Sequence, residues 1–221
     1  CEYISSVALI EAREFQLSLY SVLIRWTAVI MLIQFTVSSV NRECNEKGLD
    51  YILAMPLSRG HYVMGKALGL SLVATLLVVL SALAIGLYQF EWATLAWLLS
   101  VSFELLIVAS LALFIAISLQ NTAVSAAVVL AFYILCRALA SIELLASQPL
   151  VQSQSMAQNF IESLVVCLSQ LFPALYQFAD TQWLLYSTID SAALLDNFNQ
   201  CWVYRDLLLS ATMFDLYRNP L

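Results

Sequence analysis

Long stretches without a charged residue are the feature that most constrains this chain. Residues 67–90 contain no Asp, Glu, Lys or Arg. A helix of that length is about 36 Å long, enough to cross a hydrocarbon core of about 30 Å. Because an ionised side chain at the bilayer centre costs about 2.5–3.5 kcal/mol on insertion scales, uncharged stretches of this length predict membrane spans.

The same criterion predicts further membrane helices. Residues 105–136 are also uncharged and too many for one crossing, and the polar break at residues 118–122 divides them between two spans. Arg205 and Asp206 weaken the last of the predicted spans. We therefore predict an all-α fold, a polytopic transmembrane helical bundle. Its expected spans are residues 17–40, 67–90, 93–118, 123–145 and 199–217.

Composition supports this class and excludes others. The chain is 62% apolar and 11% charged, against about 45–50% and about 25% for soluble domains. Its net charge of −6 offers no basic face for nucleic acid, so no nucleic-acid partner is expected. Five Gly and four Pro leave no room for a flexible linker, which predicts a single domain over residues 1–221.

Positive charges set the expected orientation. No Lys or Arg occurs between Ala138 and Tyr204, whereas several crowd into the loop at residues 41–66. The positive-inside rule therefore places this loop in the cytoplasm and residues 146–198 outside. Counting crossings from there starts the chain outside, so we expect a further span before the first one identified here. The basic residues of the loop are Arg42, Lys47, Arg59 and Lys66.

Residues 146–198 have apolar side chains at helical spacing, as in Phe160, Leu164 and Leu168, with Trp183 nearby. Such a stripe with aromatic neighbours is typical of an amphipathic segment at the outer membrane interface. A partner-binding helix is the alternative.

Two states of Cys167 and Cys201 remain open at this point: a disulfide between them, or two free thiols.

The loop at residues 41–66 itself contains a short amphipathic pattern. Leu49, Ile52 and Leu53 form a small apolar face with charged residues around it, and Pro56 is expected to end the helix. The simplest interpretation is a surface helix beneath the bundle.

This loop also resembles the signature of type-2 ABC exporter permeases, a family of bacterial transporter subunits. Residues 214–218 and 103–106 are similar to a bacterial subgroup of the same family, so the resemblance covers most of the chain. The matching residues of the loop are Arg42-Glu43, Lys47-Gly48, Leu53-Ala54, Pro56, Ser58-Arg59, Tyr62 and Gly65-Lys66.

The resemblance implies a function and partners. Members have six transmembrane helices, lie in the bacterial cytoplasmic (inner) membrane and form dimers of permease subunits. Their loop is a coupling helix that rests on a separate ABC ATPase subunit, which hydrolyses the ATP. Nothing in the sequence indicates the transported substrate. The residues implied to contact the ATPase are Glu43, Glu46, Leu49, Leu53, Pro56 and Arg59.

Three charged residues fall inside the predicted spans: Arg25, Glu104 and Arg137. Counted from the outer ends of their spans, they lie within a layer of about 5 Å, so we expect that they can meet. An ion pair would offset part of the cost of inserting them. Two roles stay open, a structural clamp between helices and a place on the substrate path or gate.

Enzyme functions find little support. His61 is the single histidine, and no HExxH or GxSxG motif occurs, so we expect no catalytic residue, metal or cofactor. Residues 60–67 approach a phosphate-binding loop, but Ala67 stands where Ser or Thr would hold magnesium. The alternative to transport is a non-transporting membrane anchor or assembly scaffold whose loop docks a soluble partner.

Overall fold

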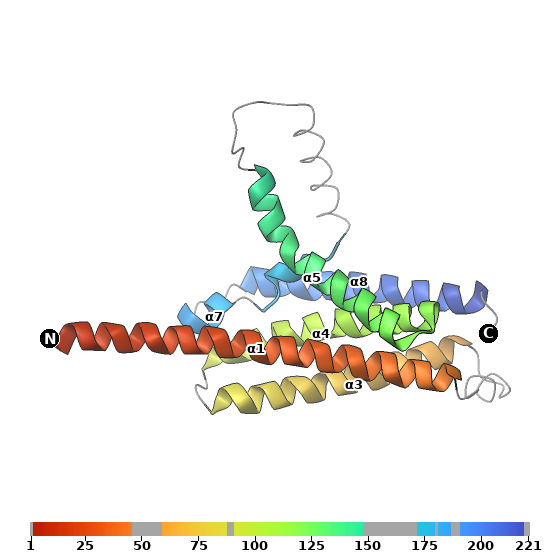
Figure 1. Cartoon of the computed structure of the whole chain (residues 1–221), viewed down its shortest axis with the longest axis horizontal. Coiled ribbons are helices and arrows are strands. Elements are labelled where there is room, and N and C mark those ends of the chain that lie inside the picture. Colours follow the sequence, from red (N-terminus) through yellow and green to blue (C-terminus); the bar gives the residue numbers. More distant parts are fainter. Residues whose placement is uncertain are drawn as a thin grey trace.

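Long α-helices make up nearly all of the structure, a computed structural model that describes residues 2–45, 59–87, 91–147, 172–179, 181–186 and 191–218 (Figure 1). No strand occurs in these ranges, and the all-α prediction is therefore confirmed. The elements are α1 (Glu2–Asn45), α3 (Arg59–Gly86), α4 (Trp92–Leu119), α5 (Thr122–Ser147), η1 (Leu175–Gln177), α7 (Thr181–Tyr186) and α8 (Ser191–Arg218).

Helix α4 forms the centre of the bundle. It packs against α1, α3, α5 and α8, and buried residues lie on all its sides. This position follows from its sequence, because a helix that is apolar all round must be covered by other helices. The outer helices leave apolar side chains uncovered, for example Leu72 on α3, which is 70% exposed. Such surfaces suit contact with lipid chains.

Four helices are long and apolar enough to cross a membrane: Phe15–Cys44, Gly60–Gly86, Trp92–Leu119 and Thr122–Leu139. They correspond to the first four predicted spans. Helix α8 begins at Ser191, well before residue 199, but it is not among these four. The crossing by residues 199–217 therefore stays a prediction.

The connection between α1 and α3 is shorter than the predicted loop at residues 41–66. Helix α1 continues to Asn45, and α3 begins at Arg59. The predicted amphipathic helix around Leu49 and its end at Pro56 lie outside the described residues. Figure 1 shows the end of α1 and the start of α3 at the same end of the bundle as the end of α8 and the α4–α5 turn. We call this the coupling-loop end.

The α4–α5 turn explains the polar break that the sequence shows at residues 118–122. Gln120 adopts a left-handed conformation (φ 51°) and ends α4. The Asn121 side chain then begins α5, because its Oδ1 accepts hydrogen bonds from the backbone N–H groups of Ala123 (3.2 Å) and Val124 (3.3 Å).

Residues 172–179 lie among the helices near the opposite end. Leu175, Phe178 and Ala179 are each at most 1% exposed, and the Phe172 ring packs edge-on against Phe132 of α5 at 5.0 Å. The predicted stripe at Phe160, Leu164 and Leu168 lies outside the described residues, and the interfacial position of the segment stays a prediction. Its described residues 172–179 pack against the bundle. Polar side chains of the surrounding helices form hydrogen bonds with the backbone of this segment, which allows it to be buried.

Candidate functional site

At the coupling-loop end, Glu43 of α1 is bonded to two residues of α3. The Tyr62 hydroxyl donates a hydrogen bond to Glu43 Oε2 (2.7 Å), and Lys66 forms an ion pair with Oε1. Lys66 also donates to the Ser39 hydroxyl oxygen (2.8 Å). The Lys66 side chain is only 15% exposed, so this pair is better shielded from water than a surface salt bridge. We call these four residues the α1–α3 clamp.

The spacing of the clamp residues shows why they meet. Ser39 and Glu43 are four residues apart on α1, and Tyr62 and Lys66 are four apart on α3, so each pair lies on one face of its helix. The motif had singled out Glu43 and Lys66 as signature residues, but not as partners. Pairing them required knowing that α1 and α3 run side by side to the two ends of the connection.

Glu43 is the one residue of the six predicted ATPase contacts whose side chain the structure describes. Both of its carboxylate oxygens bind α3. Arg59 opens α3, and its side chain lies outside the described set. Contact of these residues with an ATPase stays a prediction. The remaining four, Glu46, Leu49, Leu53 and Pro56, lie outside the described residues.

Asn41 links the same end of α1 to the α4–α5 turn. Its side chain is 1% exposed, and its amide lies 3.3 Å from the Thr122 hydroxyl, within hydrogen-bond distance. The last turns of α1 thus contact α3 through Glu43 and the start of α5 through Asn41. A displacement of this end of α1 would reach both neighbours.

The structure brings the three charges of the predicted spans into one region of the bundle. Glu104 of α4 is completely buried, and its Oε1 accepts a hydrogen bond from the Tyr133 hydroxyl of α5 (2.8 Å). Arg137 Nη1 lies 3.7 Å from the same oxygen, which makes an ion pair. Arg25 of α1, 5% exposed, also interacts electrostatically with this carboxyl group. Trp26 holds the Tyr133 ring edge-on at 5.2 Å.

Both arginines also bind the backbone of residues 172–179. Arg25 Nη1 donates to the Ala179 carbonyl (3.1 Å), and Arg137 Nη1 donates to the carbonyls of Leu175 (2.5 Å) and Phe178 (3.0 Å). Backbone outside regular α-helices requires such partners inside an apolar bundle, because an unpaired buried carbonyl is costly. The guanidinium groups therefore explain why this segment can be buried.

Helix α4 supplies further partners to Ala179, and α8 binds one of these partners. The Trp97 indole N–H donates to the Ala179 carbonyl (3.3 Å). The Ala179 backbone N–H donates to the Ser100 hydroxyl oxygen (2.8 Å). The Asn197 amide donates to the same oxygen (3.2 Å). Sequence reasoning missed Trp97, Ser100, Tyr133 and Asn197. The available signal was weak, because single polar residues in spans are common at helix contacts.

Two buried atoms of this cluster have no hydrogen-bond partner within the described part of the chain: Glu104 Oε2 and Arg25 Nε. Buried polar atoms are nearly always paired, so each exception calls for a physical reason. We refer to Arg25, Glu104, Tyr133 and Arg137 as the buried charge cluster.

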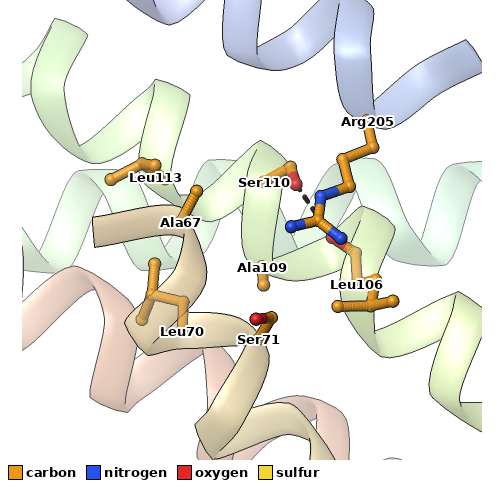
Figure 2. A pocket seen from close by; sticks show the side chains of 8 residues that line it. All are labelled: Ala67, Leu70, Ser71, Leu106, Ala109, Ser110, Leu113 and Arg205. Carbon is orange, nitrogen blue, oxygen red and sulfur yellow. Dashed lines mark hydrogen bonds between the residues drawn. The ribbon is translucent and has the colours of Figure 1, made fainter. Parts of the chain in front are cut away.

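Helix α8 carries its own cation, Arg205. Figure 2 shows its guanidinium group reaching from α8 into a crevice between α3 and α4. Small residues make room for it there, among them Ala67, Ser71 and Ala109. The group also lies over the Trp202 ring, 5.8 Å from its centre. The crevice and the ring together shelter a charge in the last predicted span.

The described cysteines Cys44, Cys136 and Cys201 are free thiols. Cys201 is buried and donates to the Phe103 carbonyl (3.5 Å), so the alternative of a disulfide to Cys167 is not formed. Cys167 lies outside the described residues. Within the described ranges, no three His, Cys, Asp or Glu side chains lie close enough together to hold a metal ion.

These features are structural links between helices: a clamp at one end and a charge cluster that holds a buried segment near the other. A model of the family described as "ABC-2 family transporter protein" matches residues 3–214. The match confirms the resemblance that the loop motif indicated. No curated protein matches the chain.

Proposed function

The chain belongs to the ABC-2 family of transporter proteins, and we propose that it is the permease subunit of an exporter driven by a separate ABC ATPase. In this proposal the ATPase binds residues 41–66 and moves them when it binds and hydrolyses ATP. The permease works as a dimer, with itself or a similar chain, in the bacterial cytoplasmic membrane. The coupling-loop end faces the cytoplasm, as the positive-inside rule predicts.

The observation that carries the proposal is the α1–α3 clamp. It joins the two helices that lead into and out of residues 46–58, through a hydrogen bond and an ion pair on the Glu43 carboxylate. Charge-assisted bonds of this kind are about twice as strong as neutral ones. A force on residues 46–58 is therefore expected to move α1 and α3 together and not to separate them.

Transport also requires that the motion reach the rest of the bundle. Asn41 connects α1 to the α4–α5 turn, and α4 packs against all the other long helices. Two arrangements of these helices, with different contacts in each, are what a permease needs to expose its pathway alternately to the two sides.

Isolation of the complex tests the function. An affinity tag on this chain, expressed in its source cell, should retrieve a subunit that contains nucleotide-binding motifs and hydrolyses ATP. Leu53→Asp places a charge on the apolar face of the loop and should reduce the recovered ATPase at least about tenfold, because it desolvates a charge at the contact. The matched control is Leu87→Asp, at an 87% exposed residue beyond the far end of α3, which should retrieve the wild-type amount.

Recovery of a partner without nucleotide-binding motifs would favour the anchor or scaffold function. Equal loss of the ATPase in both variants would show that the contact is elsewhere.

A further inference from the structure

Residues 172–179 are held in the bundle by side chains that come from different helices. Arg25 of α1 and Arg137 of α5 bind the carbonyls of Leu175, Phe178 and Ala179. These contacts add to the few backbone hydrogen bonds that the short η1 turn gives the segment. Its burial therefore depends on two cations that lie on different helices, α1 and α5.

The same two cations have a second possible partner close by. Glu104 is completely buried, and its Oε2 has no hydrogen-bond partner among the described residues. Arg137 already lies 3.7 Å from Oε1, at the edge of an ion pair, and Arg25 Nε is unpaired within the same described set. The carboxylate thus has unused acceptor capacity, and Arg25 has an unused donor.

The segment itself is strained where Arg25 binds it. Ala179 adopts a left-handed conformation (φ 54°), which is unfavourable for a residue with a Cβ atom. Such a conformation persists only while its surroundings hold it, here through Arg25, Trp97 and Ser100. Withdrawal of the segment would release this strain.

We propose that Arg25 and Arg137 position residues 172–179 as a closure of the bundle near the end opposite the coupling loop. Glu104, already ion-paired with Arg137 at 3.7 Å, then becomes the main acceptor for both arginines when the segment withdraws. The inference rests on the proposed function for its purpose, since α1 carries both Arg25 and the clamp residue Glu43. A shift of α1 at the coupling-loop end would then act directly on the bond between Arg25 and Ala179.

The exchange of partners is what makes two states accessible. If the arginines lost the carbonyls without a stronger bond to another acceptor, the buried Arg25 and the partly buried Arg137 would both lose hydrogen bonds, which is costly inside the bundle. With Glu104 available, the guanidinium groups are satisfied in both arrangements. A switch needs such a balance, because a state far above the other in free energy would not be populated.

Hydrogen–deuterium exchange of the full chain in lipid nanodiscs tests the proposal. The readout is the exchange rate of peptides covering residues 172–179, with residues 105–116 of α4 as an internal reference for the stability of the bundle. Arg25→Met removes one of the bonds that hold the segment. It should raise exchange in residues 172–179 at least about tenfold, since hydrogen bonds to charged groups are strong. Unchanged exchange there would overturn the positioning role of Arg25.

Glu104→Gln separates the proposed role from a merely structural one. Glutamine keeps the size of the side chain and an acceptor for Tyr133, but removes the charge. If Glu104 is the partner of the open state, its loss disfavours withdrawal, and exchange in residues 172–179 should fall severalfold. If Glu104 only supports the arginines in the closed state, exchange rises. A rise or no change overturns the proposal.

Should Glu104→Gln also raise exchange in the α4 reference, the comparison moves to Glu104→Asp. This variant keeps the charge but shortens the reach toward the arginines. A fall in the exchange of residues 172–179 again supports the proposal, and a rise or no change overturns it. The measurements need no ATPase and no substrate. A failure here therefore leaves the proposed transport function untouched, and a failure to retrieve an ATPase does not alter these exchange rates.

Discussion

The Tyr62 hydroxyl of α3 donates a 2.7 Å hydrogen bond to the Glu43 carboxylate of α1, between the two helices that flank the proposed coupling segment. Lys66 occupies the other carboxylate oxygen. A residue that the family motif implies as an ATPase contact is thus also the link between the two helices that leave the segment.

The clamp can be weakened without removing its hydrogen bond. Glu43→Gln retains an oxygen for Tyr62 but loses the ion pair with Lys66. We expect the free energy of unfolding to fall by about 1 kcal/mol, because the pair is partly exposed. In the isolated complex, ATP should drive a smaller movement of the permease helices, while the ATPase remains bound. Denaturant titration and ATPase assays measure the two effects.

Asp196→Asn is the matched control for this variant. Asp196 is an exposed acid on α8, so neutralising it should change stability by no more than about 0.5 kcal/mol. An equal effect of both substitutions would mean that net charge, and not the clamp, is responsible.

A double-mutant cycle measures the Glu43–Lys66 interaction itself. Lys66→Met keeps much of the apolar stem and removes the charge. The double variant Glu43→Gln/Lys66→Met should be less destabilised than the sum of the single variants by about 0.5–1 kcal/mol, as expected for contacting residues. Strict additivity would contradict a direct ion pair.

Arg137 should be among the most sensitive positions of the membrane helices. Arg137→Met leaves the carbonyls of Leu175 and Phe178 without this donor and the Glu104 carboxyl group without its 3.7 Å ion-pair partner. Breaking a buried pair by removing one partner costs about 3–5 kcal/mol. Thermal unfolding in detergent should therefore occur at a markedly lower temperature. Arg218→Met, at the exposed end of α8, should cost about 0.3–1 kcal/mol at most.

Tyr133 has a narrower role in the same cluster. Tyr133→Phe removes the hydrogen bond to Glu104 while the ring keeps its edge contact with Trp26. Because the buried Glu104 carboxyl group then loses the hydrogen bond from Tyr133, we expect the free energy of unfolding to fall by about 1–3 kcal/mol. Tyr176→Phe, at a hydroxyl whose bond to Gln177 is solvent-exposed, should cost about 0.5 kcal/mol or less. Similar stability of both variants would contradict the assignment.

The sequence predicted the depth of the buried charges better than their partners. Helical rise fixes the depth of Arg25, Glu104 and Arg137, so their common layer could be calculated from span boundaries. The bonds to Leu175 and Ala179 could not be foreseen in this way. Every residue carries a backbone carbonyl, so nothing in the sequence distinguishes the ones that a guanidinium group selects.

The helix ends were predicted less well than the helices. Charges at Arg42, Glu43 and Lys66 suggested that the loop occupied residues 41–66, yet both helices continue into it. The physical reason is that Glu43 and Lys66 pair with each other across α1 and α3, so these two charges do not need bulk water. A boundary drawn from charge alone therefore falls too early.

The most direct test of the coupling role is photo-cross-linking from the loop in the intact complex. A photoreactive amino acid at Leu49 should form an ATP-sensitive cross-link to a subunit that contains nucleotide-binding motifs, whereas the same group at Leu87 should form none. If the active complex shows no cross-link from Leu49, or shows it only from Leu87, residues 41–66 do not receive the ATPase and the proposed function is contradicted.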